Sequence, residues 1–289
     1  MEAFMCHGGP DTLSLSPSLV EAMCLTAPEQ LHLSAAAMAE AARRMERSGW
    51  SRLPFCNTLC SEGLGARPVL SLTGARVKEP PYVSPDQLPR AFFTDFPRMS
   101  ALLGAMDELT AGGASIAYSI EGPFTLLTSL LPMGKVFSAL RRPSGQELLD
   151  LAENWICQYA GLICSHGAKL LSFADPVATP DIIGDKLFTT VYVPRMKKIL
   201  RRIQAENPGI PLFLCGKMTQ GLLDRGICRT VGWIPHTACT TFGQALSVFC
   251  ARQKPDALLG HFCLNLLDAR RPYVEEIIFI NNEEKGIQL

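Results

Sequence analysis

Residues capable of chemistry follow short apolar runs in this 289-residue sequence. The clearest is Cys215, the last residue of the run IPLFLC at residues 210–215. A strand buried on both faces needs only aliphatic and aromatic side chains, so a thiol at its carboxyl end is either packing or part of a site. A Cys sulfur can bind a metal ion, although a buried Cys more often serves as a small hydrophobic residue.

Other polar residues occupy the same position after other apolar runs. The full set, which mixes possible acids with possible metal ligands, is Asn57, Glu62, Glu121, Asp175, Cys215, His236, His261 and Cys263. Asp175 could instead cap the turn before a helix, because Asp-Pro is ordinary turn chemistry, and Glu121 could face solvent. The sequence therefore leaves both readings of these two residues open.

The apolar runs alternate with segments of helical periodicity. Runs typical of strands cover residues 52–56, 115–120, 169–174, 210–215, 230–234 and 257–262, and helical segments cover 28–47, 145–166, 185–206 and 243–253. This alternation predicts an α/β domain with a parallel sheet covered by helices. No Gly-x-Gly-x-x-Gly follows the first run, so we favour a TIM-type barrel over a doubly wound sheet. In both architectures sites lie at the carboxyl ends of strands, where the candidate residues fall.

Composition argues against several classes of partner. Lys and Arg balance Asp and Glu at 27 each, which leaves no basic field for nucleic acid. The segment KKILRR, residues 197–202, is expected to be the solvated basic face of a helix. No uninterrupted apolar run approaches the roughly 18 residues of a membrane span. Eleven unevenly spaced cysteines and the lack of a basic leader followed by an apolar stretch predict a cytoplasmic protein without a disulfide framework.

Three segments resemble, in order, the uroporphyrinogen decarboxylase superfamily, and in particular its corrinoid-dependent methyltransferases, the methylcobamide:thiol branch. They are IEGPFTLLTSLLPMGKVF from residue 120, GAKLLSFADPVATPDIIGDKLFTTVYVPRMKKIL from residue 167 and IPLFLCGKMTQGLLDRG from residue 210. The resemblance implies a single (β/α)₈ barrel domain. We place it at residues 51–289, with an altered or short carboxyl end, and expect residues 1–50 to form an extension that packs on it.

Within this superfamily the resemblance favours methyl transfer over porphyrinogen decarboxylation. The decarboxylases carry an arginine-rich element before the first strand, and nothing similar precedes residue 52 here. Their strand-end Asp falls near Asn57, whose amide lacks the charge that would stabilise a cationic intermediate. The methyltransferases use a corrinoid and a small-molecule methyl donor or thiol acceptor. The corrinoid is expected on a separate protein, because no His-bearing cobalt-binding motif is evident in this chain.

The sequence departs from the methyltransferases at their zinc ligands. Phe213 replaces the His of the His-x-Cys-Gly motif, and the late Cys has no counterpart. One hypothesis is a rebuilt zinc site, with ligands drawn from Cys215, His236, His261 and Cys263. The other is loss of zinc, which leaves either acid-assisted methyl transfer or a non-catalytic barrel that binds a corrinoid or a partner.

The expected site residues follow from these hypotheses. Acid or orienting roles are assigned to Asp175, Glu121 and Glu62, with Asp175 as the first choice, because carboxylates can assist a leaving group. Substrate contacts are assigned to Asn57, Phe213 and Gly216.

Overall fold

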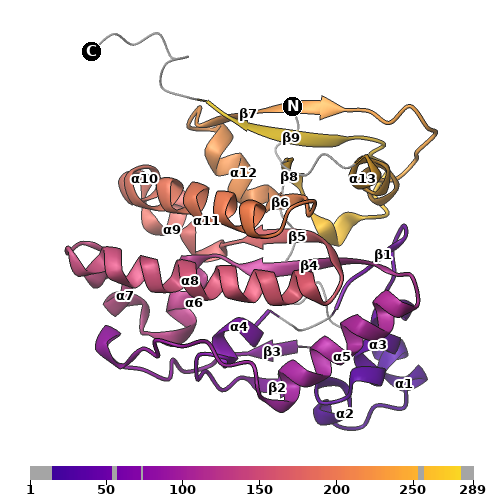
Figure 1. Cartoon of the computed structure of the whole chain (residues 1–289), viewed down its shortest axis with the longest axis horizontal. Coiled ribbons are helices and arrows are strands. Elements are labelled where there is room, and N and C mark those ends of the chain that lie inside the picture. The colour runs from indigo at the N-terminus through magenta and orange to yellow at the C-terminus, as the bar shows by residue number, and fades with distance from the viewer. Residues whose placement is uncertain (1–14, 54–56, 73, 253–256, 281–289) are drawn as a thin grey trace.

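A seven-stranded sheet is the centre of the computed structural model, which describes residues 15–53, 57–72, 74–252 and 257–280 (Figure 1). The strands lie in the order β1, β4, β5, β6, β8, β9, β7. Their bounds are Trp50–Ser51 for β1, Ser115–Glu121 for β4, Ala168–Ala174 for β5, Leu212–Cys215 for β6, Cys228–Trp233 for β7, Leu258–Phe262 for β8 and Val274–Phe279 for β9. The first five in this order run parallel, and β9 is antiparallel to both of its neighbours.

Helices cover the sheet because its strands are apolar on both faces. On β4, Ile116, Tyr118 and Ile120 join the large core formed with the long helices, and Ala117 joins a second apolar cluster. This alternation is the period of two expected of a strand. The long helices on the first face are α5 (Pro97–Ala111), α8 (Ser144–Ser165) and α11 (Val193–Glu206). Helix α13 (Phe242–Ala251) packs in the second cluster.

Shorter elements connect these layers. The remaining helices are α1 (Pro17–Ala22), α2 (Pro28–His32), α3 (Ala35–Arg44), α4 (Leu59–Glu62), α6 (Pro123–Leu130), α7 (Met133–Leu140), α9 (Pro180–Ile183), α10 (Asp185–Leu187) and α12 (Gly216–Leu223). The 3-10 turns are η1 (Pro85–Gln87), η2 (Pro176–Ala178) and η4 (Leu264–Leu266), and η3 (Phe188–Tyr192) is a π-helical turn that leads into α11. Strands β2 (Val69–Ser71) and β3 (Gly74–Arg76) form a separate antiparallel pair. No helix within the described residues has both the length and the hydropathy to cross a membrane.

The expected α/β architecture with a mostly parallel sheet is confirmed, but closure into a barrel is not seen. Among the described residues, the sheet ends at β1 on one side and at β7 on the other. In the expected barrel, successive strands would be neighbours, so the run at 230–234 would lie beside the strand at 210–215; the structure corrects this order. Strand β8 takes that place through Phe213↔Leu259, and β7 pairs instead with β9 at the far edge.

The amino-terminal helices also differ from the expected single helix at 28–47. A break at Ser34 separates α2 from α3, and the Ser34 hydroxyl caps α3 by accepting from Ala37 N at 3.2 Å. Helix α3 packs along α5, where Arg43 Nη2 lies 2.7 Å from Glu108 Oε1. Residues 1–14 of the expected extension and residues 54–56 of the expected first strand lie outside the described part of the chain.

Candidate functional site

The ends of β4 and β5 bring two acids together. Glu121 is the last residue of β4 and pairs in register with Ala174, the residue before Asp175. The Gly122 N–H donates to Ala174 O at 2.8 Å, and this hydrogen bond joins the carboxyl ends of β4 and β5. A Cβ on Gly122 would lie 2.5 Å from both Cβ and Oδ2 of Asp175, so only glycine fits here without a shift.

Asp175 holds the amino terminus of α6. Its Oδ2 accepts from Phe124 N at 3.0 Å, and its Oδ1 accepts from Thr125 N at 2.8 Å and from Thr125 Oγ1 at 2.6 Å. These backbone donors have no partner inside their own helix, and a carboxylate is the favoured acceptor there. The Asp175 side chain makes no capping bond to η2, which follows it in sequence. Asp175, which follows β5, therefore caps α6, the helix that follows the neighbouring strand β4.

The two carboxyl groups differ in protonation. Part of Glu121 reaches the surface, but its Oε2 is enclosed and has no hydrogen-bond partner among the described residues. Burial, and then the charge of Asp175, raise the pKa of Glu121 to about 8. Burial also raises the pKa of Asp175 to about 6, against the lowering effect of the bonds from Thr125 and Phe124. At neutral pH, Glu121 thus carries a proton next to an ionised Asp175.

Two further side chains, Tyr192 and Cys60, lie beside this pair. Burial, followed by the charges of Asp175 and Cys215, raises the pKa of Tyr192. The Tyr192 hydroxyl lies close enough to Asp175 to help lower the pKa of that carboxyl. It nevertheless makes no hydrogen bond of standard geometry with any described residue. Cys60 on α4 is buried, and burial together with the charge of Glu121 raises its pKa. Glu121 and Asp175 therefore lie together, and Tyr192 lies near both Asp175 and Cys215.

Sequence reasoning did not select Tyr192 or Cys60 as site residues. Tyr192 ends the π-helical turn η3, and its ring lies 5.2 Å from Phe124 and stacks 5.7 Å from Phe188. A tyrosine within a helical pattern gives no sign of such a turn. Cys60 stands two positions before Glu62 in NTLCSEGLGARPV, so its nearness to a candidate acid was the available signal.

Glu62 belongs to a different network. Its carboxylate forms a buried ion pair with Arg98 and accepts from Thr58 Oγ1 at 2.7 Å. Arg98 Nε donates to His32 Nδ1 at 3.2 Å, and burial lowers the His32 pKa to about 4, which suits a neutral acceptor. Burial raises the Glu62 pKa against the opposing charge of Arg98. The described contacts of Glu62 thus connect it through Arg98 to His32, at the end of α2, and not to Asp175.

The residues expected to bind zinc are not assembled. His261 Nδ1 lies 2.7 Å from Glu275 Oε2, and His261 Nε2 lies 3.2 Å from Gln220 Oε1, so both ring nitrogens have partners. His236 is exposed after β7, which lies at the far edge of the sheet from β6. The described part of the chain contains no group of three or more His, Cys, Asp or Glu that could hold a metal ion.

The remaining expected ligand and the substrate residues also have other roles. Cys263 Sγ accepts from Asn265 N at 3.4 Å in the turn η4. Phe213 is buried against Phe242, with ring centroids 5.9 Å apart, and offers no imidazole-like ligand. Gly216 is the buried first residue of α12, and Asn57 is exposed before α4. The donor set therefore does not fit zinc, and we derive no step through that metal.

Residues 25–232 match the uroporphyrinogen decarboxylase (URO-D) family. The chain belongs to this family. The acid pair, Tyr192 and Cys215 all lie within the matched region, whereas His236, His261 and Cys263 lie beyond it. The resemblance noted from sequence is thereby confirmed.

Individual relatives are similar over parts of their length. Methylcobamide:CoM methyltransferase MtaA of Methanosarcina barkeri is 26% identical over 196 residues, which cover 63% of this chain and 55% of that protein. MtbA of Methanosarcina acetivorans, with the same descriptive name, is 29% identical over 111 residues, 36% of this chain and 31% of that protein. The chain spans about half the length of the first of these relatives.

A solved structure supports the fold. A methyltransferase from Methanosarcina mazei superposes with a TM-score of 0.63 at 21% identity and covers 74% of this chain and 66% of that one.

Proposed function

We propose that this URO-D family chain transfers a methyl group between a small molecule and a corrinoid. The observation that carries the proposal is the acid pair at the ends of β4 and β5, with Glu121 protonated and Asp175 ionised at neutral pH. Two relatives bear the name methylcobamide:CoM methyltransferase, which supports the reaction class. The corrinoid is a substrate carried by a separate protein.

Glu121 is the proton donor in this proposal. When a methyl ether is the donor, the reduced corrinoid of the partner protein would supply the electron pair for the new bond to the methyl carbon, while the C–O bond breaks and its electron pair stays on oxygen. That oxygen takes the Glu121 proton, so the alkoxide is released as a neutral alcohol. A pKa of about 8 keeps Glu121 protonated at neutral pH while leaving it a usable acid. Water then returns the proton.

Asp175 is a positioning residue in this scheme. Its charge adds to the larger effect of burial in raising the pKa of the neighbouring Glu121, and its bonds to Phe124 and Thr125 fix the start of α6 beside the reacting groups. Glu121 therefore replaces Asp175 as our first choice of acid. Tyr192 lies beside Asp175 and near Cys215.

The test is methyl transfer from a methoxyphenol to a reduced corrinoid protein, followed by the corrinoid absorption spectrum. Glu121→Gln should lower turnover by about 10²- to 10⁴-fold, the usual contribution of a general acid. Glu275→Gln is the matched control, because Glu275 is held by His261 and Arg271 away from the pair. Full turnover of folded Glu121→Gln would contradict the proposed role.

A non-catalytic barrel that binds a corrinoid protein is the second candidate. It is favoured by Phe213, which fills the position of the family's metal-binding His, and by the use of Asp175 as a helix cap. This candidate predicts complex formation with the corrinoid protein and no methyl transfer by the wild-type chain. Measurable turnover that depends on Glu121 would exclude it.

A further inference from the structure

The segment that joins β3 to α5 carries two of the most exposed large apolar residues among those the structure describes. It covers residues 77–96, and the short turn η1 lies within it. Val83 is 66% exposed and Phe93 is 62% exposed. A large apolar patch left in water is typical of a surface that a partner covers. We call this segment the strap.

Tyr82 fixes the first half of the strap. Its N–H donates at 3.1 Å to the oxygen of Leu130, the last residue of α6, and its hydroxyl donates at 2.8 Å to Leu64 O, just beyond α4. The strap therefore crosses from α6 to α4 at this point. Because Tyr82 is held at both its backbone and its hydroxyl, the next residue, Val83, is presented to solvent from a fixed position.

Phe92 and Phe93 fix the second half of the strap at the same place. The Phe93 N–H donates to Gly63 O at 3.0 Å, one residue before Leu64. The Phe92 ring packs edge-to-face on Tyr159 of α8, with centroids 5.8 Å apart. A Cβ on Gly63 would lie 2.4 Å from Phe92 Cε2, so the close approach of the strap requires glycine. Phe92 thus faces inward and Phe93 faces solvent.

Met133 extends this apolar surface. It is the first residue of α7, three positions beyond the Leu130 that accepts from Tyr82, and it is 48% exposed. Helix α7 also contacts η1 of the strap. We call Val83, Phe93 and Met133 the apolar face. The exposed charged residues of the strap have both signs and are Lys78, Glu79, Asp86, Arg90 and Asp95. An apolar centre with a polar rim is the usual anatomy of a protein interface.

The contacts of the strap place the apolar face at the same end of the sheet as the acid pair. Cys60 of α4 adjoins Glu121, and Gly63, which holds Phe93, caps the end of the same helix. Helix α6 begins two residues after Glu121, and its last residue holds Tyr82. Both helices that support the strap therefore start from the surroundings of Glu121.

We propose that the apolar face docks the protein that carries the corrinoid. This inference rests on the proposed methyl transfer, which requires the cobalt to come within bonding distance of a methyl group held beside Glu121. A corrinoid on a separate protein reaches that position when its carrier covers the carboxyl end of β4, where the strap lies. Docking then removes Val83, Phe93 and Met133 from water, and burial of this apolar surface drives the association. Phe and Met are among the residues enriched in interfaces.

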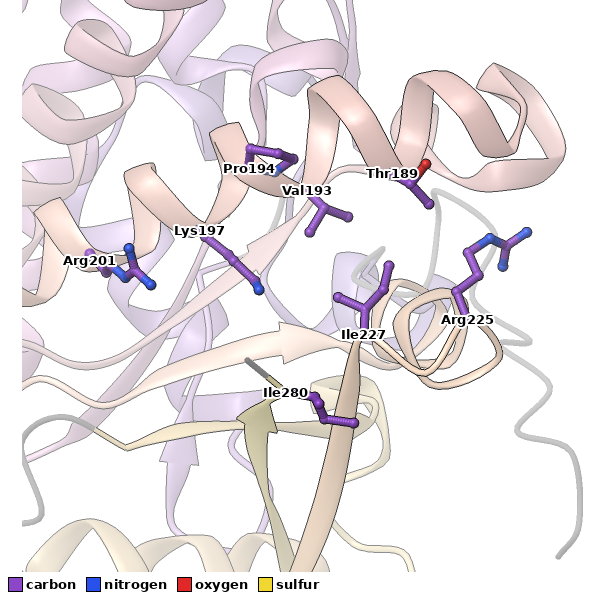
Figure 2. Close-up of a pocket in the computed structure, with 8 residues that line it drawn as sticks. All are labelled: Thr189, Val193, Pro194, Lys197, Arg201, Arg225, Ile227 and Ile280. Carbon is purple, nitrogen blue, oxygen red and sulfur yellow. The ribbon is translucent and has the colours of Figure 1, made fainter. Parts of the chain in front are cut away.

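Two other surface features do not fit this role. A cavity of about 510 Å³ lies between α11, the end of α12 and the strand pair β7 and β9 (Figure 2). Three strands separate β9 from β4 in the sheet, so a corrinoid bound there would lie away from the end of β4. The basic segment KKILRR is not a uniformly solvated face, which corrects the expectation from sequence. Lys198 and Arg202 lie 3.0 and 3.6 Å from the buried carboxylate of Glu153.

Steady-state methyl transfer with two forms of the corrinoid tests the docking. Phe93→Asp and Val83→Asp should each raise the KM for the corrinoid protein by about tenfold, which corresponds to losing about 1.4 kcal/mol, and leave kcat unchanged. Their rates with free reduced cobalamin should equal the wild-type rate, because a free corrinoid needs no docking surface. Ile234→Asp is the matched control, since Ile234 is 71% exposed but follows β7 at the far edge of the sheet. Its KM should be unchanged.

Calorimetric titration with the same corrinoid protein separates the docking from the reaction. Wild type that transfers methyl groups but binds no more tightly than Phe93→Asp would overturn the docking surface and leave the proposed function standing. Binding that weakens in Phe93→Asp, with no methyl transfer by wild type, would support the docking surface and contradict the proposed function. No binding by wild type would also overturn the docking surface.

Two further measurements complete the test. Phe93→Ala removes the ring without adding a charge, and it replaces Phe93→Asp if thermal unfolding shows that the Asp variant does not fold. Sedimentation of the chain alone tests whether the apolar face joins two copies of it. A wild-type dimer that Phe93→Asp dissociates would assign the face to self-association and overturn the proposal.

Discussion

Glu121 and Glu275 belong to strands of the same sheet, yet their surroundings shift their pKa values in opposite directions. Glu121, in the part of the chain that matches the family, has an enclosed Oε2 beside another acid, and its pKa rises to about 8. Glu275 lies beyond the matched region. Burial acts against its charge, but hydrogen bonds and charges from His261 and Arg271 bring its pKa below the usual range.

This difference shows that burial alone does not create a proton donor. Both carboxylates are partly shielded from water, and only the one without a nearby cation keeps its proton at neutral pH. Glu62 is intermediate, because its pKa is raised although it contacts Arg98. The arrangement of cations, rather than the position of an acid in the sequence, thus separates a candidate acid from a structural one.

The largest expected effect is on the pH dependence of stability. Glu121 ionises above pH 4.5 when unfolded but only near pH 8 when folded, so its stabilising effect is complete below pH 4.5 and is lost as the pH rises to about 8. We expect the free energy of unfolding to fall by roughly 5 kcal/mol across that window. Glu121→Gln should remove most of this fall in urea denaturation measured at several pH values.

Asp175 contributes with the same sign over a lower window, from its usual 3.8 to about 6. A slope that persists in Glu121→Gln below about pH 6 is therefore assigned to Asp175. If the free energy of unfolding of the wild type is constant from pH 4.5 to about pH 8, Glu121 does not have the raised pKa that distinguishes it from Glu275.

The next effect concerns the cap on α6. Asp175→Ala leaves the N–H groups of Phe124 and Thr125 without their acceptor, and we expect a loss of roughly 2 kcal/mol in free energy of unfolding. Asp175→Asn keeps one acceptor oxygen and should lose about half as much. Asp181→Ala, at an exposed acid in the first turn of α9, is the control. Equal stability of all three variants would show that the cap contributes little.

A methyl group at Gly122 should separate the strand ends. In Gly122→Ala the new Cβ would lie 2.5 Å from Asp175 Cβ and Oδ2, and we expect a loss of roughly 1.5 kcal/mol from this overpacking. Gly134→Ala in α7 has no atom within 4 Å of the new Cβ and should be neutral or slightly stabilising. Thermal unfolding of the two variants compares them directly. Similar melting temperatures would mean that the site accommodates the extra carbon.

The smallest effect is expected at the paired carboxylate. Arg271→Met removes a cation 2.6 Å from Glu275 Oε2, so the pKa of Glu275 should rise, whereas stability should fall by less than about 1 kcal/mol because the pair is partly exposed. NMR titration of the labelled carboxyl carbon measures the pKa. An unchanged value would mean that His261 alone holds the carboxylate charged.

The sequence predicted the strand ends best where an apolar run was long and continuous. Strands β4 and β5 extend the expected runs at 115–120 and 169–174 by one residue each, and Glu121 and Asp175 lie together as expected. A parallel pair with aligned ends was enough to place them. The raised pKa of Glu121 was not predictable in the same way, because it depends on which distant groups surround Oε2.

Strand order in the carboxyl-terminal part could not be inferred from the runs alone. Six register pairs join β7 to β9, a strand that the sequence analysis did not predict. With β7 at the far edge, His236 lies away from Cys215 and drops out of the expected metal set, whereas Cys215 pairs in register with Phe262, between His261 and Cys263. His261 was identified as a candidate ligand, but its partners Gln220 and Glu275 come from distant segments that no local pattern connects to it.

The π-helical turn η3 has a consequence for communication within the molecule. Its last residue, Tyr192, adjoins Asp175, and the next residue, Val193, lines a cavity of about 510 Å³. A ligand in that cavity that shifted Tyr192 would also alter the proton affinity of Asp175. Thermodynamic reciprocity then requires that protonation of Asp175 change the affinity for that ligand by the same factor. The single wide turn would serve as a two-way relay between the outer surface and the acid pair.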